Sequence, residues 1–141
     1  MKAVLCKKFG TPKNLVIEDI VEPDLNCGQV RIGIKACGVN FPDLLMIAGK
    51  YQRQPPMPFS PGCEIAGNII EIAPDITEFK LGQRVVAITG FGGMAEQVCV
   101  DARRVLVIPK TIDYVQAAGF LLAYGTAYHA LKQRAKLEAD E

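Results

Sequence analysis

The sequence predicts a mainly β protein, with a barrel core and peripheral helices at the C-terminal end. Short apolar runs rich in β-branched residues recur as far as Pro109 and are separated by Gly and Pro turns. The longest run, residues 65–72, is apolar on both faces, so it needs cover on both sides. Helical spacing of apolar residues is found mainly after Pro109, which places most of the helical structure outside the barrel.

The first strands are short. Lys2 to Cys6 and Leu15 to Val21 are expected to be strands, and Pro23 ends the second one. Gln29 to Val39 alternates between apolar and polar residues, which is typical of a half-buried strand.

A short helix and a loop come next. Pro42 favours the first turn of a helix, which Asp43 to Ala48 continues until Gly49. Residues 50–61 contain four prolines, so this segment is expected to be an extended surface loop.

The central strand is expected over Ile65 to Ile72, long, twisted and buried, with a break at Gly67. Three more strands are expected after the Leu81-Gly82 turn, and a Gly-rich turn at residues 90–93 lies between the first two. These three are Gln83 to Thr89, Met94 to Val100 and Arg104 to Ile108.

Helical structure is expected after Pro109. Asp113 is a suitable N-cap for a helix that ends near Gly119. Tyr124 to Leu137 has apolar residues near helical spacing and is expected to be a second helix.

Composition and charge exclude several kinds of partner. The chain has 141 residues, enough for one domain, and a net charge of +1 without any basic block, so we expect no nucleic-acid partner. No segment approaches the length of a membrane span, and the apolar run near Met1 is too short for a signal peptide. The five cysteines are scattered without a C-x-x-C pair, which favours a reducing, cytoplasmic location over a disulfide framework.

One motif matches a dinucleotide-binding fingerprint by chance. Residues 85–95 read as a strand followed by G-x-G-x-x-A, but that fingerprint needs a helix directly afterwards to hold the pyrophosphate. The next residues, Glu96 to Val100, favour a strand instead. We therefore interpret the segment as a tight turn.

Several motifs in order resemble those of the medium-chain dehydrogenase/reductase superfamily. They are P-G-x-E-x-x-G-x-I from Pro61, F-x-x-G-x-R-V from Phe79, and the segments ACGVNFPD, GGMAEQ and GTAYHAL. The chain is most similar to the quinone oxidoreductase (zeta-crystallin-like) branch. This resemblance implies a GroES-like, partly open β-barrel, in which the GG-x-AE segment is a hairpin.

The resemblance also bears on metal content. Zinc-dependent alcohol dehydrogenases of the superfamily place a Cys and a His where this chain has Asn40 and Cys63. Asn is a poor zinc ligand, and the only histidine, His129, lies in the late helix. We expect no zinc and disfavour a zinc-dependent alcohol dehydrogenase; stoichiometric zinc in the purified protein would contradict this.

The candidate site follows from the resemblance. Asn40 and Tyr51 match residues that line the nicotinamide and substrate site, and Thr126 and Tyr128 match the border of the cofactor cleft. A quinone stabilises the charge that a hydride brings, so a donor amide and a cofactor are chemically sufficient. Leu45 stands where some members have a second pocket Tyr, which leaves the substrate open.

Structural alternatives stay open for each of these residues. Asn40 could only cap the helix that Pro42 begins, and Tyr51 could only fill a loop. The segment Gly125-Thr126-Ala127 could be a close-packed helix contact.

The resemblance finally implies how the chain is organised. In the family, the segment 113–137 leads into a Rossmann domain that binds most of the cofactor, and residues 136–141 reach that junction. We expect residues 1–141 to be the catalytic domain, truncated before its cofactor domain and inactive alone. The helices should then expose Phe120, Leu121, Leu122 and Tyr124, which favours a homodimer or other self-association.

Three functions remain possible on the sequence. The first is the catalytic part of a zinc-independent, NADPH-dependent quinone oxidoreductase, with NADH as the alternative cofactor. The second is an enoyl or other alkene reductase acting on an enone. The third is a non-catalytic GroES-like binding module.

Overall fold

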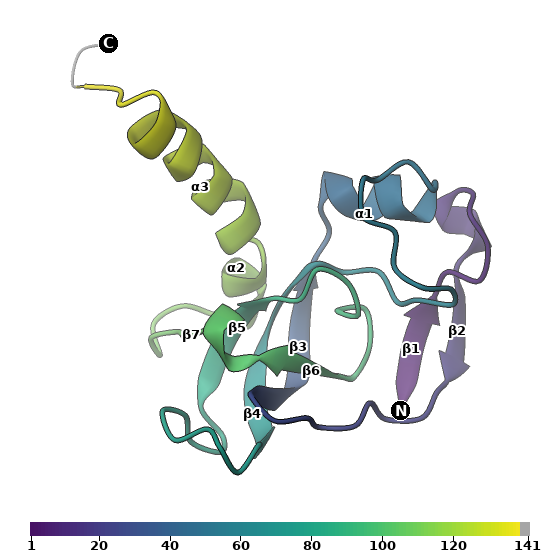
Figure 1. Cartoon of the computed structure of the whole chain (residues 1–141), viewed down its shortest axis with the longest axis horizontal. Coiled ribbons are helices and arrows are strands. Elements are labelled where there is room, and N and C mark those ends of the chain that lie inside the picture. The colour runs from purple at the N-terminus through teal and green to yellow at the C-terminus, as the bar shows by residue number, and fades with distance from the viewer. Residues whose placement is uncertain (139–141) are drawn as a thin grey trace.

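The structure, a computed structural model, describes residues 1–138 and contains two antiparallel sheets (Figure 1). A small sheet pairs β1 (Lys2–Leu5) with β2 (Val16–Asp19). A larger one has the strand order β6-β3-β4-β5-β7. Its strands are β3 (Gln29–Gly38), β4 (Glu64–Ile72), β5 (Arg84–Ile88), β6 (Gln97–Asp101) and β7 (Val105–Val107).

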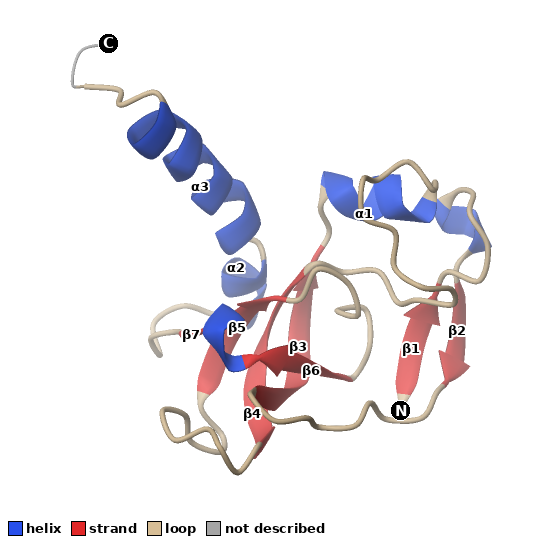
Figure 2. Ribbon diagram, in the orientation of Figure 1, coloured by secondary structure: helices blue, strands red, loops and turns tan. Residues whose placement is uncertain are grey.

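Helices lie at two places around the sheets (Figure 2). The 3-10 turn η1 (Pro12–Asn14) and helix α1 (Phe41–Ile47) lie toward the β1–β2 side. Helix α2 (Tyr114–Ala118) packs on β3 and β4, and α3 (Leu121–Tyr128) leads away from the barrel. A π-helical segment, η3 (His129–Arg134), continues α3. No helix of residues 1–138 is both long and apolar enough to cross a bilayer.

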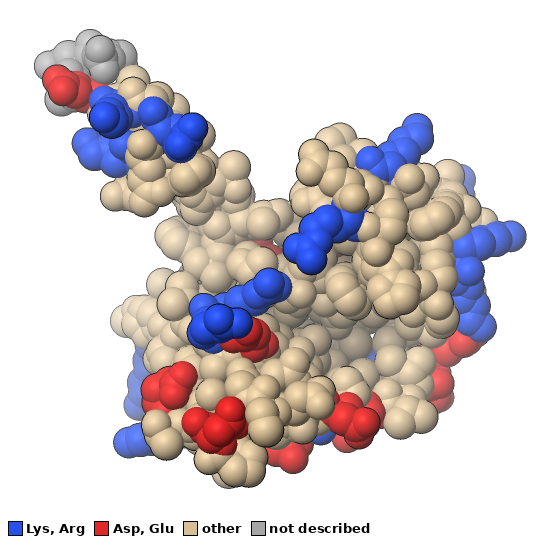
Figure 3. All heavy atoms as spheres, viewed as in Figure 1, with Lys and Arg blue, Asp and Glu red and all other residues tan. Residues whose placement is uncertain are grey.

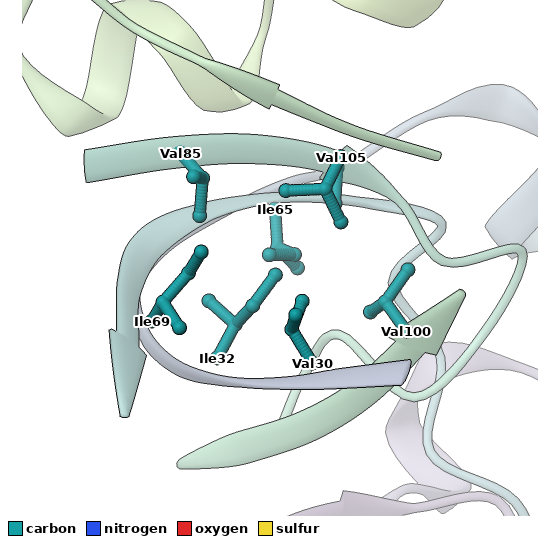
Figure 4. Close-up of a cluster of buried hydrophobic side chains, with 8 residues drawn as sticks. Val30, Ile32, Ile65, Ile69, Val85, Val100 and Val105 are labelled. Atoms are coloured by element: carbon teal, nitrogen blue, oxygen red, sulfur yellow. The ribbon is translucent and has the colours of Figure 1, made fainter. Parts of the chain in front are cut away.

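The larger sheet curls into a partly open barrel, as predicted. Its edge strands β6 and β7 are at opposite ends of the hydrogen-bonded order, yet only the 3-10 turn η2 (Ala102–Arg104) separates them along the chain. The sheet must therefore bend until its edges approach each other. Val100 and Val105, one from each edge strand, accordingly lie in the same buried cluster (Figure 4).

The core is built from β-branched residues of all five strands. Each fully buried Val or Ile contributes ~1.5–3 kcal/mol from the apolar surface that it removes from water. The cluster consists of Val30, Ile32, Ile65, Ile69, Val85, Ala87, Val100 and Val105. This face of the sheet therefore fixes the barrel, and the functional side chains lie at its rim.

The expected break at Gly67 is wrong, because β4 continues through it. Two irregularities lie nearby in the β3–β4 ladder. Lys35 is an extra residue on β3, between Ile34, which pairs with Gly67, and Ala36, and Ile70 is an extra residue on β4. Gly67 is required for another reason. A Cβ there would lie 2.2 Å from the backbone oxygen of Gly33.

The segment between β5 and β6 is not a hairpin, contrary to expectation, because these strands are not neighbours in the sheet. It crosses the rim and is fixed by backbone hydrogen bonds, from Gly92 to Ser60 at 2.7 Å and from Met94 to Pro61 at 2.8 Å. Strand β6 consequently begins at Gln97 rather than Met94. No helix follows the Gly-rich turn, so its interpretation as a turn is confirmed.

The two late helices differ in how well they were predicted. Asp113 caps α2 as expected, since its side chain accepts from the Gln116 N–H at 2.7 Å. Helix α3 begins at Leu121, three residues before the expected Tyr124, and the helix expected as far as Leu137 turns π-helical at His129.

The expected apolar exposure of these helices is confirmed for two of the four residues. Phe120 and Tyr124 are exposed and stack with ring centroids 5.0 Å apart, whereas Leu121 and Leu122 are half-buried. Self-association through this surface stays a prediction, which light scattering at several concentrations tests. The junction expected at residues 136–141 lies partly outside the described residues.

Candidate functional site

A cavity of about 430 Å³ opens at the rim of the barrel. Its walls come from α1, from the Pro-rich loop, from the turn after β5 and from the first turn of α3. Buried Met46 and Cys63 lie at its base, and Tyr51 and Phe91 line its sides. A second hollow of about 370 Å³, beside β1, is wider open and is lined by neither Asn40 nor Tyr51.

Asp43 ties the start of α1 to the Pro61-Gly62 turn. This carboxylate is fully buried and accepts the backbone N–H groups of Asn40 at 2.8 Å and of Gly62 at 2.9 Å. The Cys63 thiol also lies against it, with Sγ 3.6 Å from Oδ2. A buried carboxylate is tolerated when donors surround it, so this group fixes the geometry of the cavity base.

Glu64 is the second buried carboxylate of the site. One oxygen accepts the backbone N–H groups of Leu121 and Leu122, the latter at 3.1 Å, at the beginning of α3. The other oxygen accepts from the Asn40 side-chain amide, with Nδ2 to Oε2 at 3.4 Å. Negative charge at a helix N-terminus is favourable, so Glu64 explains why α3 begins at Leu121.

Two thiols near these carboxylates are held in the protonated form. Burial, then the charge of Asp43 and the hydrogen bond to it, raises the pKa of Cys63 to about 12. Burial, followed by the charges of Asp43 and Glu64, raises the pKa of Cys37 to about 12. Since the thiolate is the nucleophile, both side chains are weak nucleophiles at neutral pH.

Alkylation tests this assignment. In the folded protein at about pH 8, iodoacetamide should label Cys63 and Cys37 at least about 100-fold more slowly than exposed Cys27, because burial restricts access and little thiolate forms. The rate at Cys63 should still rise with pH above about pH 10, since its raised pKa keeps it protonated there. Peptide mass spectrometry measures each rate; labelling of Cys63 as fast as Cys27 would contradict the assignment.

The positions of the zinc ligands in related enzymes serve other contacts here. Asn40 donates to Glu64, and Cys63 lies on Asp43. Among residues 1–138 no three His, Cys, Asp or Glu side chains are grouped so that they could hold a metal ion. The expectation of no zinc stays a prediction.

The structure separates the four predicted site residues into two groups. Tyr51 lines the cavity, and Asn40 is half-buried at the N-cap of α1, beside Pro42 in the cavity wall. Its side-chain bond goes to Glu64 rather than to the helix it precedes. Thr126 and Tyr128 are exposed on α3 and do not line the cavity.

Sequence reasoning missed three contributors to the site. Glu64, the acidic residue of the P-G-x-E motif, joins Asn40 to α3. Arg53 and Arg104 line the cavity from segments about fifty residues apart. The P-G-x-E motif pointed to Glu64, but no local signal marked the two arginines.

Comparison with known proteins gives this geometry a context. Residues 26–110 match the model of the alcohol dehydrogenase GroES-like domain. A quinone oxidoreductase-like protein 2 homolog of Nematostella vectensis is 40% identical over 99% of this chain, which spans 38% of that protein.

Two solved structures extend the similarity to the fold. The human synaptic vesicle membrane protein VAT-1 homolog-like protein superposes with a TM-score of 0.94 at 32% identity, over 98% of this chain and 44% of that one. The quinone oxidoreductase of Thermus thermophilus, also solved with NADPH, superposes with a TM-score of 0.79 at 36% identity, over 94% of this chain and 41% of that one.

This chain therefore spans about two fifths of the relatives it matches, and its match to the domain model covers more than half of its own residues. The motif order, the partly open barrel and the domain match agree with one another. The chain belongs to the alcohol dehydrogenase GroES-like domain family, within the medium-chain dehydrogenase/reductase superfamily.

Proposed function

We propose that this domain forms the substrate pocket of an NADPH-dependent quinone oxidoreductase that works without zinc. The observation that carries the proposal is a largely apolar cavity that contains Tyr51, together with half-buried Asn40, which lies two residues before Pro42 in the cavity wall. The similarity to quinone oxidoreductases, one of them solved with NADPH, supports it. Most of the cofactor would be held by a further, Rossmann-type domain, as the resemblance to the superfamily implies.

The Asn40 side chain suits a carbonyl or carboxamide oxygen. An Asn amide has two N–H donors, and the contact with Glu64 uses one of them, which leaves the second for a ligand. Glu64 also holds the amide in one orientation, since its other oxygen is anchored on α3. The donor set therefore fits both the nicotinamide carboxamide and a quinone oxygen.

NADPH, when bound, supplies a hydride, which leaves NADP⁺ and converts the quinone to a hydroquinone anion that takes one proton from water. Asn40 would stabilise the oxygen on which that charge develops. Tyr51 and Phe91 would hold the flat ring, and the apolar base would exclude water around it. Cys63, kept as a neutral thiol, would resist addition to the electrophilic ring.

Helix α3 would border the cofactor through one of its faces. Thr126 follows Leu122, a cavity residue, by four positions, so the two share a face of the helix. Thr126 therefore stays a proposed contact of the nicotinamide. Tyr128 follows Tyr124 by four positions, so it shares the face of the aromatic pair and not that of Leu122.

The test supplies the cofactor domain. We would fuse this chain to the cofactor-binding part of the Thermus thermophilus quinone oxidoreductase and follow NADPH oxidation with 1,4-naphthoquinone as acceptor. We expect turnover from the fusion and none from the 141-residue chain alone. Reduction of 2-cyclohexenone but not of the quinone would favour the alkene reductase alternative. A folded fusion that binds NADPH and reduces neither would overturn both.

The same assay tests Asn40. Asn40→Ala should lower kcat/KM for the quinone by about 10- to 100-fold, because a hydrogen bond to developing charge is lost. The loss of activity should appear mainly in kcat, and the thermal midpoint should fall by a few degrees because one oxygen of buried Glu64 loses its donor. Asn14→Ala, on the exposed turn η1, is the matched control and should leave turnover unchanged. Equal activity of the two variants would remove Asn40 from the mechanism.

A further inference from the structure

Two arginines line the cavity identified above. Arg53 comes from the Pro-rich loop and Arg104 from the turn η2, and both side chains are exposed. On the face shown in Figure 3, basic side chains lie on both sides of a hollow near the centre. The cavity thus has an apolar base and two positive charges toward solvent.

Asp101 interacts with the charge of Arg104, but it does not line the cavity. None of the residues of 1–138 that line the cavity is Asp or Glu. Neither Arg53 nor Arg104 has a hydrogen bond or an ion pair with any described residue. A charged side chain on a pocket wall, free of local partners, is available to a ligand.

The neighbouring Arg103, in the same turn, differs from Arg104 because its side chain is paired with a carboxylate. It binds both carboxylate oxygens of Asp101, with Nη2 to Oδ2 at 2.5 Å and Nε to Oδ1 at 3.0 Å. These bonds, more than the charge of Arg104 nearby, lower the pKa of Asp101 to about 2. Asp101 is therefore paired mainly with Arg103. The guanidinium of Arg104 has no hydrogen bond to Asp101 and lines the cavity.

We propose that the pocket selects a substrate with an anionic substituent, a carboxylate, sulfonate or phosphate group, held by Arg53 and Arg104 while its flat apolar part fills the base. The proposal rests on the proposed function only in naming that flat part as a quinone or enone. The distribution of the lining residues supports the proposal. Met46 and Cys63 are buried at the base of the cavity, whereas the two arginines are exposed to solvent. A purely apolar substrate would use the base alone.

The expected discrimination is moderate, because exposed charges are screened by water and salt. Two arginines should favour an anion over a neutral isostere by about 5- to 20-fold in Kd at low ionic strength. That ratio should fall as salt is added, whereas the apolar contribution should not.

The experiment uses the 141-residue chain and two probes of nearly equal shape, 2-naphthoate and 2-naphthamide, with binding followed by NMR. At about 0.01 M ionic strength, naphthoate should bind more tightly, and at about 0.15 M the difference should shrink. In Arg53→Gln/Arg104→Gln the preference should disappear while naphthamide binding is retained. Arg134→Gln, an exposed arginine on η3 outside the cavity lining, should keep the preference.

Some outcomes would overturn the proposal. Equal Kd values for the two probes, or a preference that survives in the double variant, would show that the arginines do not select the substrate. Inorganic pyrophosphate binding more tightly than naphthoate, and weakened in the double variant, would assign the arginines to the phosphates of the cofactor instead.

Failure of the proposed function is distinguishable from these results. A fusion enzyme that reduces no quinone or enone would overturn the redox assignment, yet the naphthoate preference would still hold. Conversely, a fusion that reduces 1,4-naphthoquinone and its 2-sulfonate with equal kcat/KM would retain the activity and exclude the anion preference.

Discussion

Gly67→Ala should prevent the chain from folding stably, with a loss of about 3 kcal/mol or more in the free energy of unfolding. The new Cβ would lie 2.2 Å from the Gly33 carbonyl oxygen and 3.0 Å from the Gly33 carbonyl carbon. Both strands here are central in the sheet, so neither backbone can move without breaking the β3–β4 ladder. Urea unfolding followed by circular dichroism measures the loss.

The same substitution in α3 is the matched control. A Cβ on Gly125 meets nothing within 4 Å, and Ala is a better helix former than Gly by ~1 kcal/mol. Gly125→Ala should therefore leave the free energy of unfolding unchanged or raise it slightly. If Gly67→Ala were as stable as Gly125→Ala, the close approach of β3 and β4 at this point would be wrong.

Glu64→Ala should lower the free energy of unfolding by about 3 kcal/mol, because it leaves three donors without their acceptor. These donors are the N–H groups of Leu121 and Leu122 and the amide of Asn40. Glu64→Gln should cost less, about 1 kcal/mol, since one oxygen still accepts from α3 and the Asn40 amide can rotate. Hydrogen exchange should accelerate at Leu121 and Leu122 in both variants.

Glu71→Ala provides the comparison on the same strand. Glu71 is paired with Arg31 at 2.7 Å, but its side chain is 53% exposed, so its removal should cost less than about 1 kcal/mol. A Glu64→Ala variant no less stable than Glu71→Ala would show that the buried carboxylate does not hold α3 on the barrel.

The sequence by itself determined the local elements and the class of the fold. Alternating residues placed the strand at Gln29, the Asp113 cap placed α2, and four prolines marked the loop at residues 50–61. These signals are local, because strand periodicity, capping and proline geometry depend on neighbours in the chain. The ordered motifs added the family, since their spacing carries more information than any one of them.

Only the tertiary structure decided the contacts that make the site. Glu64 accepts a hydrogen bond from Leu121, 57 residues away, which explains the earlier start of α3, and Arg53 and Arg104 line one cavity. Strands β5 and β6 are also not neighbours in the sheet, so the segment between them crosses the rim instead of forming the expected hairpin. Such contacts depend on how the sheet curls to bury both faces of the first half of β4, and no pattern within a short stretch of chain records that curvature.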